Sequence, residues 1–151
     1  MQAGISALLV HSRPGPLQGL EQALQGLAVK TSQAQSISEV KGLLEVPEAP
    51  ELVFTDTQLL DGTWTDVVRL GEAAAVPVNV IVVSRLVDVR FYVEVIEGGA
   101  FDFIAPPFEP SGLAHVVCCA AGNVLRRRDV QTHAGDHGQG TLALAVPPSG
   151  L

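Results

Sequence analysis

Short runs of almost continuous apolar residues alternate along this chain with segments whose apolar residues repeat every three or four positions. The runs lie at Ile5–Val10, Glu51–Asp56, Val78–Ser84 and Phe101–Ile104, with a weaker one at Leu27–Thr31. A strand that is apolar on both faces belongs inside a parallel sheet that is covered by helices. The pattern therefore predicts five parallel strands.

The segments between these runs predict five helices. Apolar spacing, capping residues and helix-ending residues place them at Leu17–Leu27 (after Pro14 and Pro16), Ser36–Leu44, Thr65–Ala75, Val89–Ile96 and Leu113–Arg128. A strand followed by a helix, five times over, predicts an α/β fold with a doubly wound parallel sheet.

The chain has 151 residues, 47% of them apolar and 17% charged, which fits one domain with a substantial core. From Asp129 onward the alternation is lost and glycine and proline become frequent, except in one apolar island at Leu142–Val146. We expect a folded domain at residues 1–128 and a flexible extension at residues 129–151. For the island, addition of a strand to a sheet edge and docking on a partner are both open.

Charge and cysteine content narrow the class of protein. Nine basic and sixteen acidic residues give a formal charge of −7, which argues against binding to nucleic acid through phosphate contacts. No apolar run is long enough to span a bilayer, and Met1 does not begin a secretory signal. Cys118 and Cys119 are adjacent and are interpreted as reduced thiols. We expect a cytoplasmic protein without a membrane segment.

In a doubly wound sheet the functional crevice lies at the carboxyl ends of the strands. This places His11 and Ser12 after the first predicted strand, Asp56 at the end of the third, and Ser84 with Arg85 after the fourth. The loop from Ala105 to Phe108 follows the fifth predicted strand. These residues are the candidates for a site.

At this point the sequence resembles the receiver domain of response regulators in two-component signalling. The resemblance covers about residues 5–128. It rests on the order and spacing of five features: Asp56 after its strand, Leu60-Asp61-Gly62, Ser84, Gly99–Phe103 and Pro106–Phe108. The nearest type is that of nitrogen-regulation activators. The resemblance implies a flavodoxin-like sheet in the order 2-1-3-4-5, and we expect no antiparallel strand between residues 5 and 104.

The resemblance also implies roles for individual residues. Asp56 occupies the phosphoacceptor position, and Ser84 and Phe103 occupy the two switch positions. The bond between Pro106 and Pro107 is expected to be cis. The implied protein is a bacterial signalling module of a phosphorelay, not an enzyme.

The sequence departs from the family at three supporting positions. The two acidic positions after the first strand hold His11 and Ser12, and the lysine position before the strand-five proline holds Pro106. The only lysines, Lys30 and Lys41, lie far away in the sequence. Magnesium prefers carboxylate oxygens, so we expect weak or absent magnesium binding and no other metal or cofactor.

Two other side chains are candidates to replace the missing charge. We expect a hydrogen bond or ion pair between His11 and Asp56. Arg85 either folds over Asp56 as a replacement cation or points into solvent, and both alternatives are open.

Phe91 and Val95 lie off the stripe of Val89, Val93 and Ile96 that we assign to the core. We therefore expect Phe91 and Val95 to form an exposed apolar pair on the fourth helix. This pair predicts a surface of helix four, strand five and helix five that binds a protein partner or forms a homodimer. A histidine kinase is a further possible partner.

The leading hypothesis is a pseudo-receiver that binds partners and has impaired phosphotransfer. The alternative is a receiver that a histidine kinase still phosphorylates on Asp56. A small α/β enzyme or nucleotide binder is disfavoured, because residues 11–15 contain no glycine-rich phosphate loop. No output domain is recognised, and both a stand-alone regulator and the receiver portion of a longer protein are open.

Overall fold

The computed structural model describes residues 4–13 and 15–137. Five strands form the main sheet: β1 (Ser6–Val10), β2 (Lys30–Ala34), β3 (Leu52–Thr55), β6 (Asn79–Val83) and β7 (Asp102–Ile104). The helices are α1 (Leu20–Gln25), α2 (Ile37–Leu44), α3 (Trp64–Glu72), α4 (Val89–Glu97) and α5 (Pro110–His137). A short hairpin, β4 (Gln58–Leu59) and β5 (Gly62–Thr63), lies between β3 and α3.

The main sheet has the order β2-β1-β3-β6-β7, and all four pairings are parallel. In sequence order of these strands this is 2-1-3-4-5, so the predicted sheet is confirmed. The strand order reverses between β1 and β3, which places the crevice of the fold above the carboxyl ends of these two strands.

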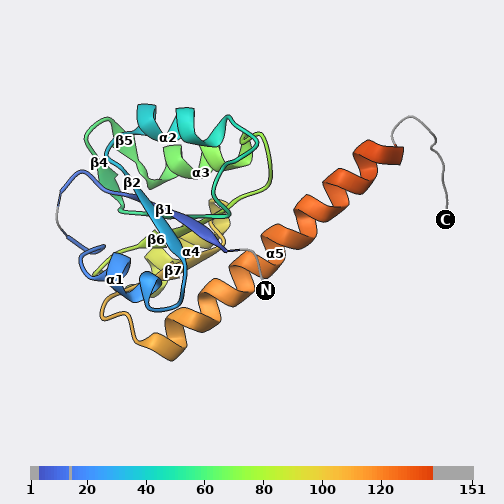
Figure 1. Cartoon of the computed structure of the whole chain (residues 1–151). Helices are drawn as coiled ribbons and strands as arrows, with labels where there is room; N and C mark the ends of the chain where they lie inside the picture. The colour runs from blue at the N-terminus through green and yellow to red at the C-terminus, as the bar shows by residue number, and fades with distance from the viewer. Residues whose placement is uncertain (1–3, 14, 138–151) are drawn as a thin grey trace.

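Helices cover both faces of the sheet (Figure 1). On one face α1 and α5 pack on alternate strand residues such as Leu9, Phe54 and Ile81. On the other face α2, α3 and α4 pack on the residues between them, such as Val53 and Val82. The continuous apolar runs seen in the sequence supply both cores at once.

The first third of the chain differs from the prediction in two elements. Helix α1 begins at Leu20 rather than near Leu17, because Gly19 has a φ of 87° and interrupts the helical backbone before it. Strand β2 begins at Lys30 rather than at Leu27. β2 is an edge strand of mostly polar residues, and its weak apolar pattern placed it three residues too early.

The β4–β5 hairpin is antiparallel and was not predicted, so the expectation of no antiparallel strand between residues 5 and 104 is wrong here. Its Asp61 accepts hydrogen bonds from the backbone N–H groups of Ile37 (2.8 Å) and Ser38 (3.4 Å) at the start of α2. A Cβ on Gly62 would lie 2.5 Å from Asp66 Oδ2. The hairpin therefore needs glycine there and links α2 to α3.

Helix α5 continues to His137, so the prediction that it ends at Arg128 is wrong. In Figure 1 its C-terminal half leaves the body of the domain. Residues 129–137, expected to be part of a flexible extension, are helical. Residues 138–151, which include the island, lie outside the described residues.

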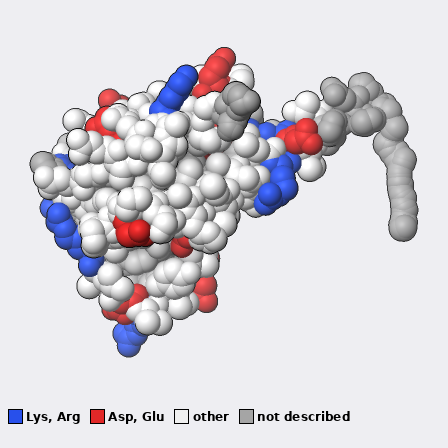
Figure 2. Space-filling view, turned by 60° about the horizontal axis from the view of Figure 1, so that its bottom comes forward, with Lys and Arg blue, Asp and Glu red and all other residues white. Residues whose placement is uncertain are grey.

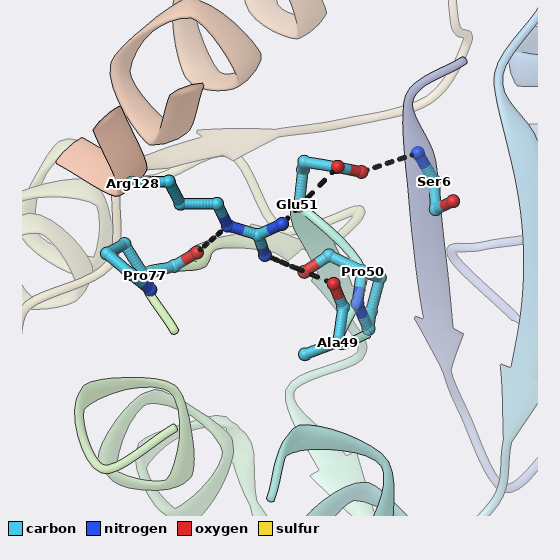
Figure 3. A network of polar contacts seen from close by, with 6 residues as sticks. All are labelled: Ser6, Ala49, Pro50, Glu51, Pro77 and Arg128. Carbon is cyan, nitrogen blue, oxygen red and sulfur yellow. Dashed lines mark hydrogen bonds and ion pairs between the residues drawn. The ribbon is translucent and has the colours of Figure 1, made fainter. Parts of the chain in front are cut away.

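Arg128 connects α5 to the loops that precede β3 and β6, at the amino-terminal ends of these strands (Figure 3). Its guanidinium donates to the carbonyl oxygens of Pro77 (2.8 Å), Ala49 (3.1 Å) and Pro50 (3.1 Å), and it pairs with Glu51 at 3.4 Å. Burial lowers the pKa of Arg128, and the carboxylate of Glu51 acts in the opposite direction. Arg128 is therefore held against the domain, whereas Arg126 on the same helix is exposed.

Replacing Arg128 with alanine is expected to lower the free energy of unfolding by about 2 kcal/mol, since hydrogen bonds to a charged group are lost and three carbonyls lose their donor. Arg126→Ala, an exposed neighbour on the same helix, is the control and should change it by less than about 0.5 kcal/mol. Urea denaturation measures both. Equal stability of the two variants would contradict this role for Arg128.

Candidate functional site

Four loops meet at the carboxyl end of the sheet. Asp56 follows β3, and its backbone N–H donates to Val10 of β1 at 3.0 Å. Ser84 follows β6, and its N–H donates to Ile104 of β7 at 3.1 Å. The sheet therefore places Asp56, Ser84, the loop after β1 and the loop after β7 around one crevice, as predicted from the sequence.

Asp56 is the buried carboxylate of this crevice, with 1% of its surface exposed. Its Oδ1 accepts a hydrogen bond of 2.7 Å from the N–H of Thr57. Its Oδ2 is buried and has no hydrogen-bond partner among the described residues. A Cβ on Gly15 would lie 4.0 Å from Oδ2, so the β1–α1 loop passes close to this oxygen.

His11 does not pair with Asp56, so that prediction is wrong. Its Nε2 lies 2.7 Å from Oε1 of Gln33, and its Nδ1 lies 3.3 Å from the carbonyl oxygen of Arg13. Gln33 lies on β2 opposite Leu9 of β1, so β1 separates it from β3 and Asp56. The imidazole therefore turns toward the edge strand and not into the crevice.

Ser12 links three loops. Its Oγ donates to the carbonyl oxygen of Gln35 at 2.8 Å and accepts from the N–H of Leu60 at 2.9 Å. These contacts join the β1–α1 loop to the β2–α2 loop and to the β4–β5 hairpin. At a position where the family resemblance implies a metal-binding carboxylate, this chain has a structural hydroxyl whose proton is already donated.

Pro106 lies in the loop after β7, and its bond to Pro107 is cis, as expected. A proline side chain carries no donor, so it supplies no cation to the crevice. Neither lysine replaces it: Lys30 begins β2, and Lys41 on α2 pairs with Glu45 at 3.0 Å.

Arg85 is exposed, and its Nη2 donates to the carbonyl oxygen of Gly15 at 3.3 Å. The side chain thus reaches across the crevice to the loop that passes Asp56 Oδ2. This arrangement lies between our two alternatives, because Arg85 is folded toward the crevice but contacts backbone there.

The residues present do not fit a magnesium ion. Asp56 is the one carboxylate that the described residues bring to the crevice positions, and Ser12 and His11 are engaged elsewhere. Among the described residues no group of three histidine, cysteine, aspartate or glutamate side chains could hold a metal ion. Octahedral magnesium needs oxygen ligands, preferably anionic, and one carboxylate is a poor donor set.

Of the two switch positions, Ser84 lies at the crevice and Phe103 lies on β7 against α4. Ser84 is 7% exposed, and its Oγ accepts from the N–H of Leu86 at 3.0 Å. Phe103 is half-buried and packs edge to face on Phe91 and Tyr92, at centroid distances of 5.7 and 6.1 Å. Phe91 in turn packs on Trp64 at 6.2 Å, so an aromatic row joins β7 through α4 to the start of α3.

This row corrects the assignment of the two faces of α4. Val95 is fully buried and Phe91 packs against the core, whereas Val89 and Val93 are 80% and 43% exposed. The prediction that Phe91 and Val95 form an exposed pair is therefore wrong. Apolar side chains do gather on the outer face and its preceding loop: Leu86, Val87, Val89, Tyr92 and Val93.

A pocket of about 350 Å³ opens beside Asp56 and Ser84. Its lining combines polar residues that follow β3 and β6 or lie in β4 and β5 with apolar residues of α3, α4 and the β6–α4 loop: Thr57, Gln58, Thr63, Trp64, Ser84, Leu86 and Phe91. The sequence analysis did not assign Thr57 or Gln58 to the site. Their position directly after Asp56 was the available signal.

Comparison with known proteins found one curated relative. No family model matches the chain. It is 27% identical over 114 residues to response regulator protein PilR of Pseudomonas aeruginosa, a match that covers 76% of this chain and 25% of PilR. The chain thus spans about a quarter of the length of this curated relative.

Solved structures share the fold. A response regulator receiver protein from Pseudomonas putida superimposes with a TM-score of 0.62 at 24% identity, covering 78% of this chain and 98% of that one. The non-phosphorylated HemR receiver domain of Leptospira biflexa gives 0.61 at 23%, covering 78% and 94%. A CheY-like receiver domain protein from Methanospirillum hungatei gives 0.66 at 18%, covering 82% and 98%.

Among the described residues no helix is both long and apolar enough to cross a membrane. The strand order, the buried aspartate after β3, the serine after β6 and the aromatic residue on β7 are those that the sequence resemblance implied. Together with the match to PilR and the shared fold, they support a receiver domain of the response-regulator type.

Proposed function

We propose that this receiver domain serves two-component signalling as a protein-interaction module in which magnesium-dependent phosphotransfer is impaired. Receiver domains are generally signalling modules rather than enzymes. The proposal rests on the crevice itself: the supporting positions hold His11, Ser12 and Pro106, and the first two have hydrogen-bond partners away from Asp56. A bacterial cytoplasm is the compartment that fits this role.

Incubation with acetyl phosphate and magnesium is expected to leave the mass of this protein unchanged. The mass of the Asp56→Asn variant should also stay unchanged. The physical reason is that a phosphoryl group on Asp56 would add negative charge to a crevice where the described residues provide neither a group of metal ligands nor a lysine to balance it. Intact-mass spectrometry after a short incubation measures the adduct. A magnesium-dependent mass increase that Asp56→Asn abolishes would contradict impaired phosphotransfer.

The second candidate function is a receiver that a histidine kinase still phosphorylates on Asp56. One observation favours it: Asp56 Oδ2 has no partner among the described residues, and Arg85 contacts the loop beside it. A carboxylate can act as a nucleophile and form an acyl phosphate. If an adduct forms, its loss in Arg85→Ala and retention in Arg85→Lys would identify Arg85 as the replacement cation.

The outer face of α4 is the proposed interaction surface, with β7 and α5 beside it. It presents Val87, Val89 and Val93 to solvent, in place of the pair expected from the sequence. Several large apolar side chains close together on one helix face and its preceding loop are typical of protein-binding surfaces. A homodimer is the case that can be measured without knowledge of another partner.

Replacing Val89 and Val93 together with serine is expected to weaken self-association about tenfold or more, because apolar area buried at the contact is lost. Sedimentation velocity over a concentration series measures the association constant. Leu60→Ser, which removes an 82% exposed apolar side chain from the hairpin, is the matched control. A dimer that persists unchanged in the double variant would show that this face is not the contact.

A further inference from the structure

A groove of about 430 Å³ lies on the other side of the domain from the α4 surface, between α5 and the start of β2. Its walls come from three places: the segment before β1, the turn between α1 and β2, and one face of α5. The lining residues are Gly4, Ile5, Leu27, Ala28, Val29, Val117, Cys118, Ala121, Gly122 and Leu125.

The surface of the groove is mostly apolar. None of its lining residues is charged. Val117, Ala121 and Leu125 are spaced by four on α5, so they follow one side of the helix. In Figure 2 most of the body is uncharged, with basic and acidic side chains scattered over it and others of both signs near the point where α5 leaves it. The groove therefore favours an uncharged, apolar segment of chain.

The chain itself contains such a segment. Thr141–Val146 has no charged residue, and in an extended conformation Leu142, Leu144 and Val146 share one face while Ala143 and Ala145 share the other. Two extended residues advance about 6.6 Å, close to the advance of about 6 Å for four residues of helix. Alternate residues of the island thus match successive positions of the α5 face.

The length of chain after α5 is sufficient for a return to the groove. Leu125 and Ala121 lie twelve and sixteen residues before His137, about 18 and 24 Å along the helix. Leu144 and Val146 lie seven and nine residues after His137, and an extended chain covers about 23 and 30 Å over those lengths. The difference of about 5 Å leaves room for a reversal at Gly138 and Gly140, which both tolerate turn conformations.

We propose that Leu142–Val146 binds the groove of its own chain, antiparallel to α5, with Leu144 near Leu125 and Val146 near Ala121. This goes beyond the proposed signalling role, since it concerns neither Asp56 nor the α4 surface. It assigns the apolar island a place on the domain, and it covers apolar surface that the described residues leave open.

The two cysteines supply a matched pair of probes. Cys118 and Cys119 are both exposed and adjacent, but Cys118 lines the groove, whereas Cys119 lies 3.7 Å from His115 Nε2 outside it. Cys119→Ser leaves Cys118 as the reporting thiol, and Cys118→Ser leaves Cys119. The rate of reaction with a disulfide reagent such as dithionitrobenzoate measures the exposure of each thiol in the full chain.

In the Cys119→Ser background, Leu144→Ser with Val146→Ser is expected to raise the reaction rate of Cys118 about fivefold or more, because an occupied groove shields the thiol. Ala143→Ser with Ala145→Ser, on the other face of the island, should leave that rate unchanged. The rate of Cys119 in the Cys118→Ser background should change in neither case. A chain that ends at Gly140 should behave like the Leu144 and Val146 variant.

Equal rates for Cys118 with and without the two apolar side chains would overturn the proposal. A parallel rise for Cys119 would also overturn it, since the effect would then not be local to the groove. Protection of Cys118 that is lost on dilution would assign the groove to the island of a second copy and overturn binding within one chain.

Discussion

Magnesium is expected to raise the melting temperature of the His11→Asp/Ser12→Asp variant and to leave that of the wild-type domain unchanged. In the variant three carboxylates stand at the crevice, which is the donor set that a hard divalent cation prefers. In the wild type Asp56 is joined by an imidazole that contacts Gln33 and by the hydroxyl of Ser12, which bridges loops.

The expected size follows from binding to the folded state alone. A ligand at about ten times its dissociation constant stabilises the fold by about 1.4 kcal/mol, or about 3–6 °C for a domain of this size. Ser12→Asp keeps an acceptor for Leu60 but loses the donor to Gln35, so the metal-free variant starts from a lower melting temperature. Each protein is therefore compared with itself, with magnesium and with a chelator.

The control is His11→Asn/Ser12→Asn, because asparagine has nearly the shape of aspartate but no negative charge. The melting temperature of this variant should not respond to magnesium. Differential scanning fluorimetry or calorimetry measures all three proteins. A clear rise for the wild type would contradict the conclusion that its crevice does not fit magnesium. No rise for the aspartate variant would show that more than the two replaced carboxylates separates this crevice from a working metal site.

The strands that the sequence predicted best are those buried on both faces. β1, β3 and β6 are apolar almost throughout, and the structure places them in the centre of the sheet. β2 lies at an edge, where polar residues are tolerated, so its pattern is weak and its predicted position was displaced. Burial on both faces is thus what makes a strand recognisable in this sequence.

Helix α4 shows where periodicity alone fails. Val89, Val93 and Ile96 have helical spacing, and so do Phe91 and Val95. Either stripe satisfies the local rule, and the choice depends on what the rest of the chain offers. Trp64 and Phe103, from α3 and β7, provide aromatic partners for Phe91 and so determine which face turns inward.

At the site, too, the sequence predicted where residues lie along the chain better than it predicted which side chains they contact. The ends of β3 and β6 placed Asp56 and Ser84 correctly, because strand ends are local features of the sequence. The partner of His11 was not predictable in the same way, since Gln33 is 22 residues away and belongs to the strand whose register the sequence left uncertain. The contacts of Arg128 were not predictable for a similar reason, since its carbonyl acceptors come from two loops that are distant in the sequence.

Val95→Ser is expected to lower the free energy of unfolding by about 2–4 kcal/mol, because methyl groups are lost from a packed core and a hydroxyl is left there without an assured partner. Val95 is fully buried among residues of the α2–α3–α4 face. Val93→Ser, two residues away on the same helix, is the matched control, and its 43% exposed side chain should cost less than about 0.5 kcal/mol. Urea denaturation of the two variants gives both values with one assay. If serine at position 93 proved the more damaging, α4 would present the face first expected from the sequence, and the surface proposed for partner binding would have to move with it.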